Sequence, residues 1–133
     1  IPVCGHVGLT PQSVHKLGGY KVQGKDEAEA DQIIKEALIL EEAGAELIVV
    51  ECVPNSLGAS LSHALNIPVI GIGAGADTDG QVLVLHDMLG ISQRLPKFTK
   101  NFLTGKDSIQ DAITAYGDDV RSGNFPASEH CFK

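Results

Sequence analysis

The sequence has no stretch that could cross a membrane, because no part of it approaches the ~18 consecutive apolar residues of a spanning helix. It is also poor in basic residues: ten Lys and Arg stand against seventeen Asp and Glu, for a formal net charge of −7. An acidic chain has no general attraction to polyphosphate backbones. We therefore expect neither nucleic acid nor a membrane as a partner, although a small anionic ligand could still bind at one local site.

Cysteine is scarce and irregularly spaced. Cys4, Cys52 and Cys131 are odd in number and form no Cys-x-x-Cys motif, which argues against a disulfide framework and against a cysteine metal or redox site. We therefore expect a reducing, cytoplasmic location, with a buried and inert thiol at Cys52 rather than a nucleophile. The chain also lacks an initiator methionine and a signal-peptide pattern, so we expect it to begin within a longer protein.

The composition is that of one globular domain. The 133 residues are 43% hydrophobic and 20% charged, and a chain of this length can bury roughly two-thirds of its unfolded surface. Short apolar runs alternate with helical patterns along the chain. This alternation is typical of βα units and predicts an α/β fold around a parallel sheet.

The N-terminal region predicts a strand, a long loop and a helix. An apolar run over residues 1–5 predicts the strand. Residues 6–24 form a loop of unusual length, and the apolar residues within it indicate that it packs against the body of the protein. Asp26 has the position and side chain of a helix cap, which predicts a helix over 27–43 that ends at Gly44.

Later segments continue the alternation of strands and helices. Residues 46–51 and 67–71 predict buried strands, separated by a helix that begins near Pro54. A last helix is predicted over 106–122. Its inward face is expected to comprise Ile109, Ile113 and Tyr116.

Residues 78–90 allow two interpretations. The apolar run over 82–85 favours a strand, whereas Thr78 with Gln81 as a capping box favours a helix. The connection from Gly73 is shorter than the dozen or more residues that a parallel crossover normally needs. Both interpretations stay open at this stage.

A glycine-rich segment follows the third expected strand. Gly71, Gly73 and Ala76 have the spacing of the dinucleotide-binding fingerprint G-x-G-x-x-G/A. Such a site requires a helix that opens at the third small residue, whereas Asp77 and Asp79 continue a loop with two negative charges. We therefore expect these glycines to let a loop fold tightly over the strand end.

Two polar residues follow expected strands. Glu51 ends an otherwise apolar strand, where α/β folds place their chemistry and where apolar walls would raise its pKa toward that of a general base. The alternative is that Glu51 caps the following helix. His6 follows the first expected strand, so the side chains of His6 and Glu51 could converge over one end of a sheet. The alternative that His6 has a purely structural role stays open.

His86 and Asp87 are weaker candidates for a functional site, because two ligands alone do not make a hard-metal site.

Several longer motifs resemble the ketopantoate hydroxymethyltransferase family. They occur in the family's order along nearly the whole chain, and together they are much more specific than a single fingerprint. The motifs are Pro2 to Ser13, Gly18 to Gly24, Val50 to Pro54, Ile67 to Gly75, Thr78 to Gln81, His86-Asp87, Pro96 to Phe98 and Asn101-Phe102. One departure is Ala76, where the family often has Asn.

The resemblance implies a (βα)₈ barrel of about twice this length, of which residues 1–133 are the C-terminal half. It implies hydroxymethyl transfer from 5,10-methylenetetrahydrofolate to 3-methyl-2-oxobutanoate, which gives ketopantoate for coenzyme A synthesis, with Mg²⁺. In that chemistry the ion withdraws charge from the carbonyl and stabilises the enolate that attacks the folate-borne carbon. It also implies a homo-oligomer, which in the family is a decamer.

Two site residues carry over from the resemblance. Glu51 matches the family's proton acceptor, His6 matches a substrate-facing histidine, and residues 71–75 match the rim of the barrel mouth. The family's metal ligands and its substrate-binding Lys and Ser lie on earlier strands, so no residue of this chain is assigned to the metal. We expect activity only together with the missing N-terminal half. The alternative is a catalytically incomplete fragment or a stand-alone small-ligand binding module.

Overall fold

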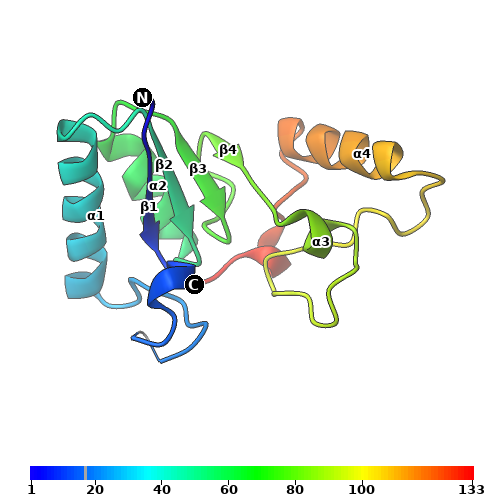
Figure 1. Ribbon diagram of the computed structural model, residues 1–133, viewed down its shortest axis with the longest axis horizontal. Helices are drawn as coiled ribbons and strands as arrows, with labels where there is room; N and C mark the ends of the chain where they lie inside the picture. Colours follow the sequence, from blue (N-terminus) through cyan, green and yellow to red (C-terminus); the bar gives the residue numbers. More distant parts are fainter. Residues whose placement is uncertain (17) are drawn as a thin grey trace.

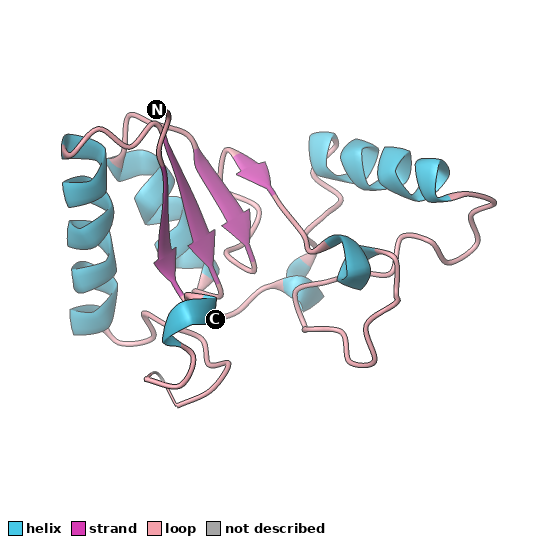
Figure 2. Ribbon diagram, in the orientation of Figure 1, coloured by secondary structure: helices cyan, strands magenta, loops and turns pink. Residues whose placement is uncertain are grey.

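A four-stranded parallel sheet forms the centre of the structure (Figures 1 and 2). The computed structural model describes residues 1–16 and 18–133. The strands follow one another across the sheet in chain order, as β1 (Cys4–Gly8), β2 (Leu47–Glu51), β3 (Val69–Ile72) and β4 (Gly80–Gln81). The predicted α/β class is confirmed.

Two helices connect the first three strands and pack on one face of the sheet (Figure 1). α1 (Glu27–Glu42) follows β1, and α2 (Asn55–Ala64) follows β2. Every second strand residue points at these helices. The resulting core includes Val7, Ile48, Val50 and Val69 from the strands and Ile33, Ala37, Leu57 and Leu61 from the helices. Burial of each large aliphatic side chain contributes about 1.5–3 kcal/mol.

The ends of α1 confirm the predicted cap and stop. The Asp26 carboxylate accepts a hydrogen bond from the backbone N–H of Glu29 at 2.9 Å, which satisfies one of the free amides of the first turn. Gly44 follows the helix with a φ of 98°, a left-handed conformation that costs glycine no steric clash.

The first strand differs from its prediction. It spans Cys4–Gly8 rather than 1–5, because pairing in register with β2 carries it to the residue where β2 ends. The loop that follows packs against the body as expected, with Leu9 and Val14 both buried. Leu17, which belongs to the same predicted loop, lies outside the described residues.

Residues 78–90 contain both a strand and a helix: the strand precedes the predicted run over 82–85, and the helix is shorter than the second interpretation gave. β4 comprises only Gly80–Gln81, and α3 (Leu85–Met88) follows it. Thr78 and Gln81 do not cap α3. Their side chains instead bond to each other within the loop, at 2.8 Å.

The parallel connection from β3 to β4 is short because its loop is tied back to β3. The backbone N–H of Asp79 donates to the carbonyl of Val69 at 2.9 Å, and the Asp79 carboxylate accepts from the Val69 N–H at 2.8 Å. Gly73 and Gly75 both have positive φ, which lets the chain reverse within a few residues. The expected tight loop over the strand end is therefore confirmed, and no helix opens at Ala76.

The C-terminal helix, α4 (Ile109–Arg121), begins later than the predicted residue 106. It begins where the Ser108 side chain accepts a hydrogen bond from the Asp111 N–H at 3.1 Å. Ala112 is the fully buried residue of this helix, whereas Ile109 and Ile113 remain about half exposed. The predicted inward face is therefore wrong for the two isoleucines.

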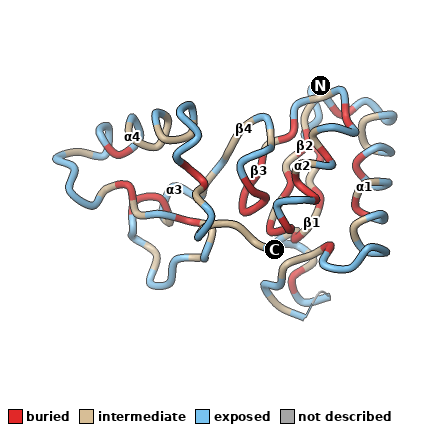
Figure 3. Tube along the Cα trace, turned by 180° about the vertical axis from the view of Figure 1, so that it is seen from behind, coloured by how far each residue is buried: buried red, intermediate tan, exposed pale blue. Residues whose placement is uncertain are grey.

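Tyr116 does face inward, as predicted. Its ring packs edge-on against Phe102 and Phe125, with 5.3 Å between the centroids of Tyr116 and Phe102. This cluster is separate from the core under the sheet, and Figure 3 shows buried residues around α3 and α4 apart from those of the sheet. Within residues 1–16 and 18–133, no helix has the length and apolar character needed to cross a membrane.

Two helical glycines give a matched test of the packing. A Cβ on Gly58 of α2 would overlap the backbone carbonyl oxygen of Ala74, whereas a Cβ on Gly117 of α4 would meet only the flexible Arg121 guanidinium. We expect Gly58→Ala to destabilise by about 1–3 kcal/mol, and Gly117→Ala to be neutral or to stabilise by up to about 1 kcal/mol. Urea unfolding of the full-length protein measures both. Equal effects of the two substitutions would contradict this packing.

Candidate active site

The second face of the sheet carries the candidate site residues. Residues that alternate with the core positions point away from α1 and α2, and they include Leu47, Val49 and Glu51 of β2 and Ile70 of β3. These side chains are only half-buried. A parallel sheet normally has both faces covered. In the part of the chain that the structure describes, α1 and α2 cover only the other face, and this face is apolar but half-exposed.

His6 and Glu51 meet on this second face. His6 Nε2 lies 3.0 Å from Glu51 Oε2, although the two residues are 45 positions apart. The register explains the contact: Gly8 pairs with Glu51, and His6 lies two residues earlier on the same face of the neighbouring strand. The predicted convergence is confirmed, but His6 lies inside β1 rather than after it.

The Glu51 carboxylate is the more enclosed member of the pair. Its side chain is 15% exposed, against 32% for His6. Burial raises the pKa of the Glu51 carboxyl above its ordinary value, and the positive charge and hydrogen bond of His6 offset part of that rise. Pro54 is the N-cap residue of α2, and this helix start has no side-chain cap, while the Glu51 carboxylate bonds to His6, so the alternative that Glu51 caps this helix is wrong.

Backbone contacts hold the strand end that carries Glu51. The Leu9 N–H donates to the Glu51 carbonyl at 2.8 Å, and the Gln23 N–H donates to the Cys52 carbonyl at 2.9 Å, so both ends of the β1–α1 loop are tied to β2. Gly8 makes the first contact possible. Its φ is 85°, and any Cβ there would overlap the Glu51 carbonyl oxygen.

Cys52 directly follows the candidate base and is buried, as predicted. Burial and the neighbouring Glu51 charge raise the pKa of its thiol to about 11, which leaves very little nucleophilic thiolate at neutral pH. Its backbone φ is 55°, an unusual value for a residue with a side chain. Such local strain occurs preferentially at functional sites, and here it turns the chain immediately after Glu51.

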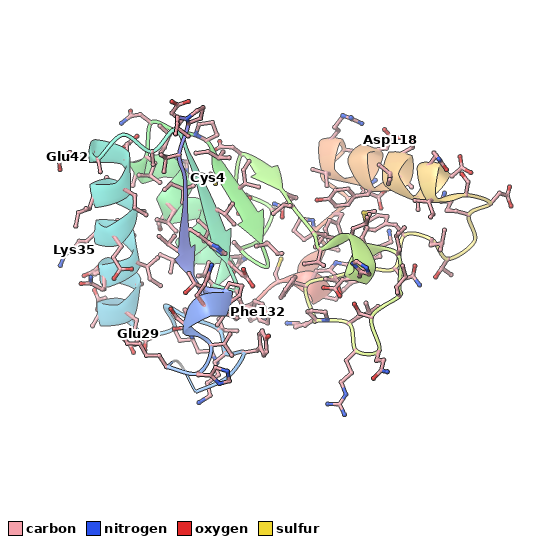
Figure 4. The ribbon with its side chains drawn as sticks, viewed as in Figure 1. Cys4, Glu29, Lys35, Glu42, Asp118 and Phe132 are labelled. Atoms are coloured by element: carbon pink, nitrogen blue, oxygen red, sulfur yellow. The ribbon has the colours of Figure 1, made fainter. Side chains whose placement is uncertain are left out.

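A cavity of about 600 Å³ adjoins Glu51 at the carboxyl ends of β1, β2 and β3. The segment 94–98 and the tail residue Phe132 close its other side, so residues distant in sequence share one pocket. The labelled Phe132 lies beyond the ends of the strands in Figure 4. Asp87, predicted as a weak candidate, lines this cavity, whereas Phe132 was missed because the tail has no strand or helix pattern.

The described residues do not assemble a metal-binding cluster. In residues 1–16 and 18–133, no group of three or more His, Cys, Asp or Glu side chains is placed to hold a metal ion. Asp87, which lines the cavity, accepts from the Ser92 hydroxyl at 2.5 Å, and Asp79 accepts from the Val69 N–H at the opposite end of β3. The residues present therefore do not fit a magnesium site.

Comparison with known proteins assigns the family. A family model described as ketopantoate hydroxymethyltransferase matches residues 1–128. The chain belongs to the ketopantoate hydroxymethyltransferase family. This family is a TIM barrel, and the four parallel strands with their connecting helices agree with part of such a barrel.

Curated relatives agree along the whole chain. The proteins named 3-methyl-2-oxobutanoate hydroxymethyltransferase from Alteromonas mediterranea and Idiomarina loihiensis are 58% and 60% identical to it, and each alignment covers 100% of the chain. The protein of that name from Pseudomonas fluorescens is 60% identical over 99% of the chain. The chain spans about half the length of these relatives, between 50% and 51% of each.

Proposed function

We propose that the protein containing this chain transfers a hydroxymethyl group from 5,10-methylenetetrahydrofolate to 3-methyl-2-oxobutanoate and forms ketopantoate, with Glu51 as the proton acceptor. The family and the names of the relatives support the reaction class and the 2-oxo acid. The observation that carries the role of Glu51 is its pairing with His6 on the uncovered sheet face, at the carboxyl end of the strands. Barrel enzymes place their catalytic groups at this end.

We propose that residues 1–133 are the C-terminal half of one (βα)₈ barrel. Two observations support this. The chain spans about half the length of its relatives, and within residues 1–16 and 18–133 the four-stranded sheet has one face without a covering layer and two unpaired edge strands. In a closed barrel that face becomes the interior and the edges become paired, which removes the exposed backbone groups of an edge strand. Glu51 and His6 then lie inside the mouth of the barrel.

The proposed reaction breaks the C3–H bond of the 2-oxo acid. Glu51 takes the proton, and the electron pair of that bond is shared with the carbonyl as an enolate. The enolate carbon forms the new bond to the methylene carbon of the donor, whose two bonds to nitrogen are broken in the course of the reaction. Water supplies the hydroxyl group of the product, and the remaining water proton and the C3 proton end on the two donor nitrogens.

The site environment suits Glu51 to this role. A carboxylate with an ordinary pKa is a weak base, and burial moves the pKa of Glu51 upward toward the working pH. His6 supports the charged form, and among the described residues no hydrogen bond engages its second ring nitrogen, Nδ1, which can therefore meet a ligand. In the imidazolium form both nitrogens donate, one to Glu51 and the other to the anionic 2-oxo acid.

Three further features complete the proposal. Magnesium is expected from the family resemblance, but this chain offers no cluster that fits it, so we assign its ligands outside the chain and no step here depends on it. A cytoplasmic location agrees with three cysteines that form no disulfide. Self-association into a homo-oligomer is expected from the resemblance.

Glu51→Gln tests the proton acceptor. The amide keeps the size of the side chain and removes its basicity, so exchange of the C3 proton of 3-methyl-2-oxobutanoate with D₂O should fall by about 10²–10⁴-fold in the full-length protein. Proton NMR of the substrate measures the rate, and calorimetry should show that the 2-oxo acid still binds. Glu46→Gln, at the exposed residue just before the same strand, is the control and should leave exchange intact. Wild-type exchange in Glu51→Gln would refute the assignment.

His6→Ala tests the second member of the pair. Exchange requires ionised Glu51, so its rate falls as the pH drops through the pKa of Glu51, which burial raises above its ordinary value. Because His6 lowers that pKa, its removal should move the acidic limb of the pH profile to higher pH and weaken binding of the 2-oxo acid. His63→Ala, on the exposed last turn of α2, should do neither. If His6→Ala lowers the Tm but changes neither the acidic limb of the pH profile nor the affinity for the 2-oxo acid, His6 is only structural.

A further inference from the structure

The C-terminal tail links two separate clusters of buried residues. At its start, Phe125 is buried in the aromatic cluster beside α4. Further along the tail, Phe132 packs against the buried cluster that includes Leu9 and Cys52 at the ends of the strands. Residues 126–131 span the distance between the two clusters, and the red end of the ribbon in Figure 1 follows this path from α3 toward the carboxyl ends of the strands.

Contacts with two other segments hold Phe132 at the strand ends. Its backbone carbonyl accepts a hydrogen bond from the Asn55 N–H at 3.1 Å, and its ring meets the Phe98 ring edge to face, with 6.3 Å between the centroids. Lys97 Nζ lies 5.2 Å from the centroid of the Phe132 ring and donates to the neighbouring Cys131 carbonyl at 2.5 Å. In this position Phe132 forms one wall of the cavity beside the proposed proton acceptor.

A short turn between the two anchors sets the length of the tail. Residues Ser128–His130 form a 3₁₀ helix, and the His130 ring closes it, because the Ala127 N–H donates to His130 Nδ1 at 3.1 Å. A 3₁₀ helix rises about 2.0 Å per residue, whereas an extended chain rises about 3.3 Å. Opening of this turn would therefore lengthen the tail by about 4 Å, and the tail would no longer draw Phe132 against Phe98.

The hydrogen bond that closes the turn requires an unprotonated Nδ1 on His130, since a ring nitrogen that carries a proton cannot accept. Burial lowers the pKa of His130, and among the charged groups around it Glu129 opposes this change while Lys100 adds to it. Lys100 pairs with Asp119 of α4 at 2.7 Å, which moderates its effect on the ring. The closed turn therefore favours the neutral ring, and a proton on Nδ1 leaves the Ala127 N–H without this acceptor.

We propose that residues 127–133 are a clasp that positions Phe132 in the cavity wall, and that His130 is the positioning residue that holds this clasp closed. The effect of the clasp on catalysis rests on the proposed function: reactants beside Glu51 react only in a narrow range of orientations, so loss of one wall slows the reaction. The closed clasp binds a proton less readily than the open one. Its stability is therefore complete above the ordinary pKa of histidine and falls as the pH drops below that value.

Fluorine NMR of the full-length protein with 4-fluorophenylalanine at position 132 tests the clasp without an activity measurement. With His130 present, the resonance should move toward its position in the urea-unfolded protein as the pH falls from about 8 to about 5. His130→Asn keeps an acceptor at the place of Nδ1 but does not titrate, so its resonance should not move in this range. His130→Ala should show the shifted resonance at both pH values. His63→Asn, on the exposed last turn of α2, is the control and should behave like the wild type.

Ketopantoate formation tests the positioning role. Phe132→Ala should lower kcat/KM by about 10-fold or more at pH 8, because the cavity loses a wall. Phe132→Leu should recover part of this loss, and Lys133→Ala, at the exposed neighbour outside the cavity, should cause none. His130→Asn should lose less kcat/KM than the wild type between about pH 8 and about pH 5, because only its clasp stays closed.

Two results would overturn the clasp: a fluorine shift with pH in His130→Asn equal to that of the wild type, or a wild-type resonance in His130→Ala. Wild-type kcat/KM in Phe132→Ala would overturn the positioning role. If the wild-type protein forms no ketopantoate at any pH while the fluorine resonance behaves as expected, the proposed function is refuted and the clasp alone stands.

Discussion

The candidate site depends on one contact, the 3.0 Å approach of His6 Nε2 to the Glu51 carboxylate. A carboxylate with 15% of its side chain exposed would be costly to ionise alone, and burial does raise its pKa. His6 opposes that rise without abolishing it. A base must be ionised and yet retain affinity for a proton, and this balance provides both properties.

The fold supplies the contact through backbone pairing. The parallel register puts Gly8 opposite Glu51, and the absent side chain lets the β1–α1 loop bond directly to the end of β2. The left-handed Cys52 then turns the chain away. These constraints fix the Glu51 carboxylate at the carboxyl end of β2. In the proposed barrel, the N-terminal half would complete its surroundings on the second sheet face. The same strand ends border the cavity of about 600 Å³.

Local sequence signals predicted the elements that local chemistry determines. The Asp26 cap, the Gly44 stop and the apolar β2 are all confirmed, because each depends on a few neighbouring residues. The bounds of β1 were wrong, since they depend on a register with a strand some forty residues away. The predicted meeting of His6 and Glu51 was right for a coarser reason: parallel strands bring their carboxyl ends to one edge.

Other parts required tertiary structure. The position of β4 within residues 78–90 depends on two hydrogen bonds between Asp79 and Val69. Phe132 reaches the cavity because its carbonyl accepts from the Asn55 N–H across the fold, and nothing in the tail sequence indicates this contact. Ile109 and Ile113 are exposed because Ala112 is the buried residue of α4 that packs against Phe102 and Phe125.

The most direct test of the account is reconstitution of the barrel from two separately purified halves. This chain carries the proposed base but leaves one face of its sheet uncovered, so alone it should show no exchange of the C3 proton of 3-methyl-2-oxobutanoate in D₂O. Addition of the N-terminal half of the protein should restore exchange and ketopantoate formation. Exchange by this chain alone, with the other half excluded by mass spectrometry, would contradict the claim that Glu51 acts within a closed barrel.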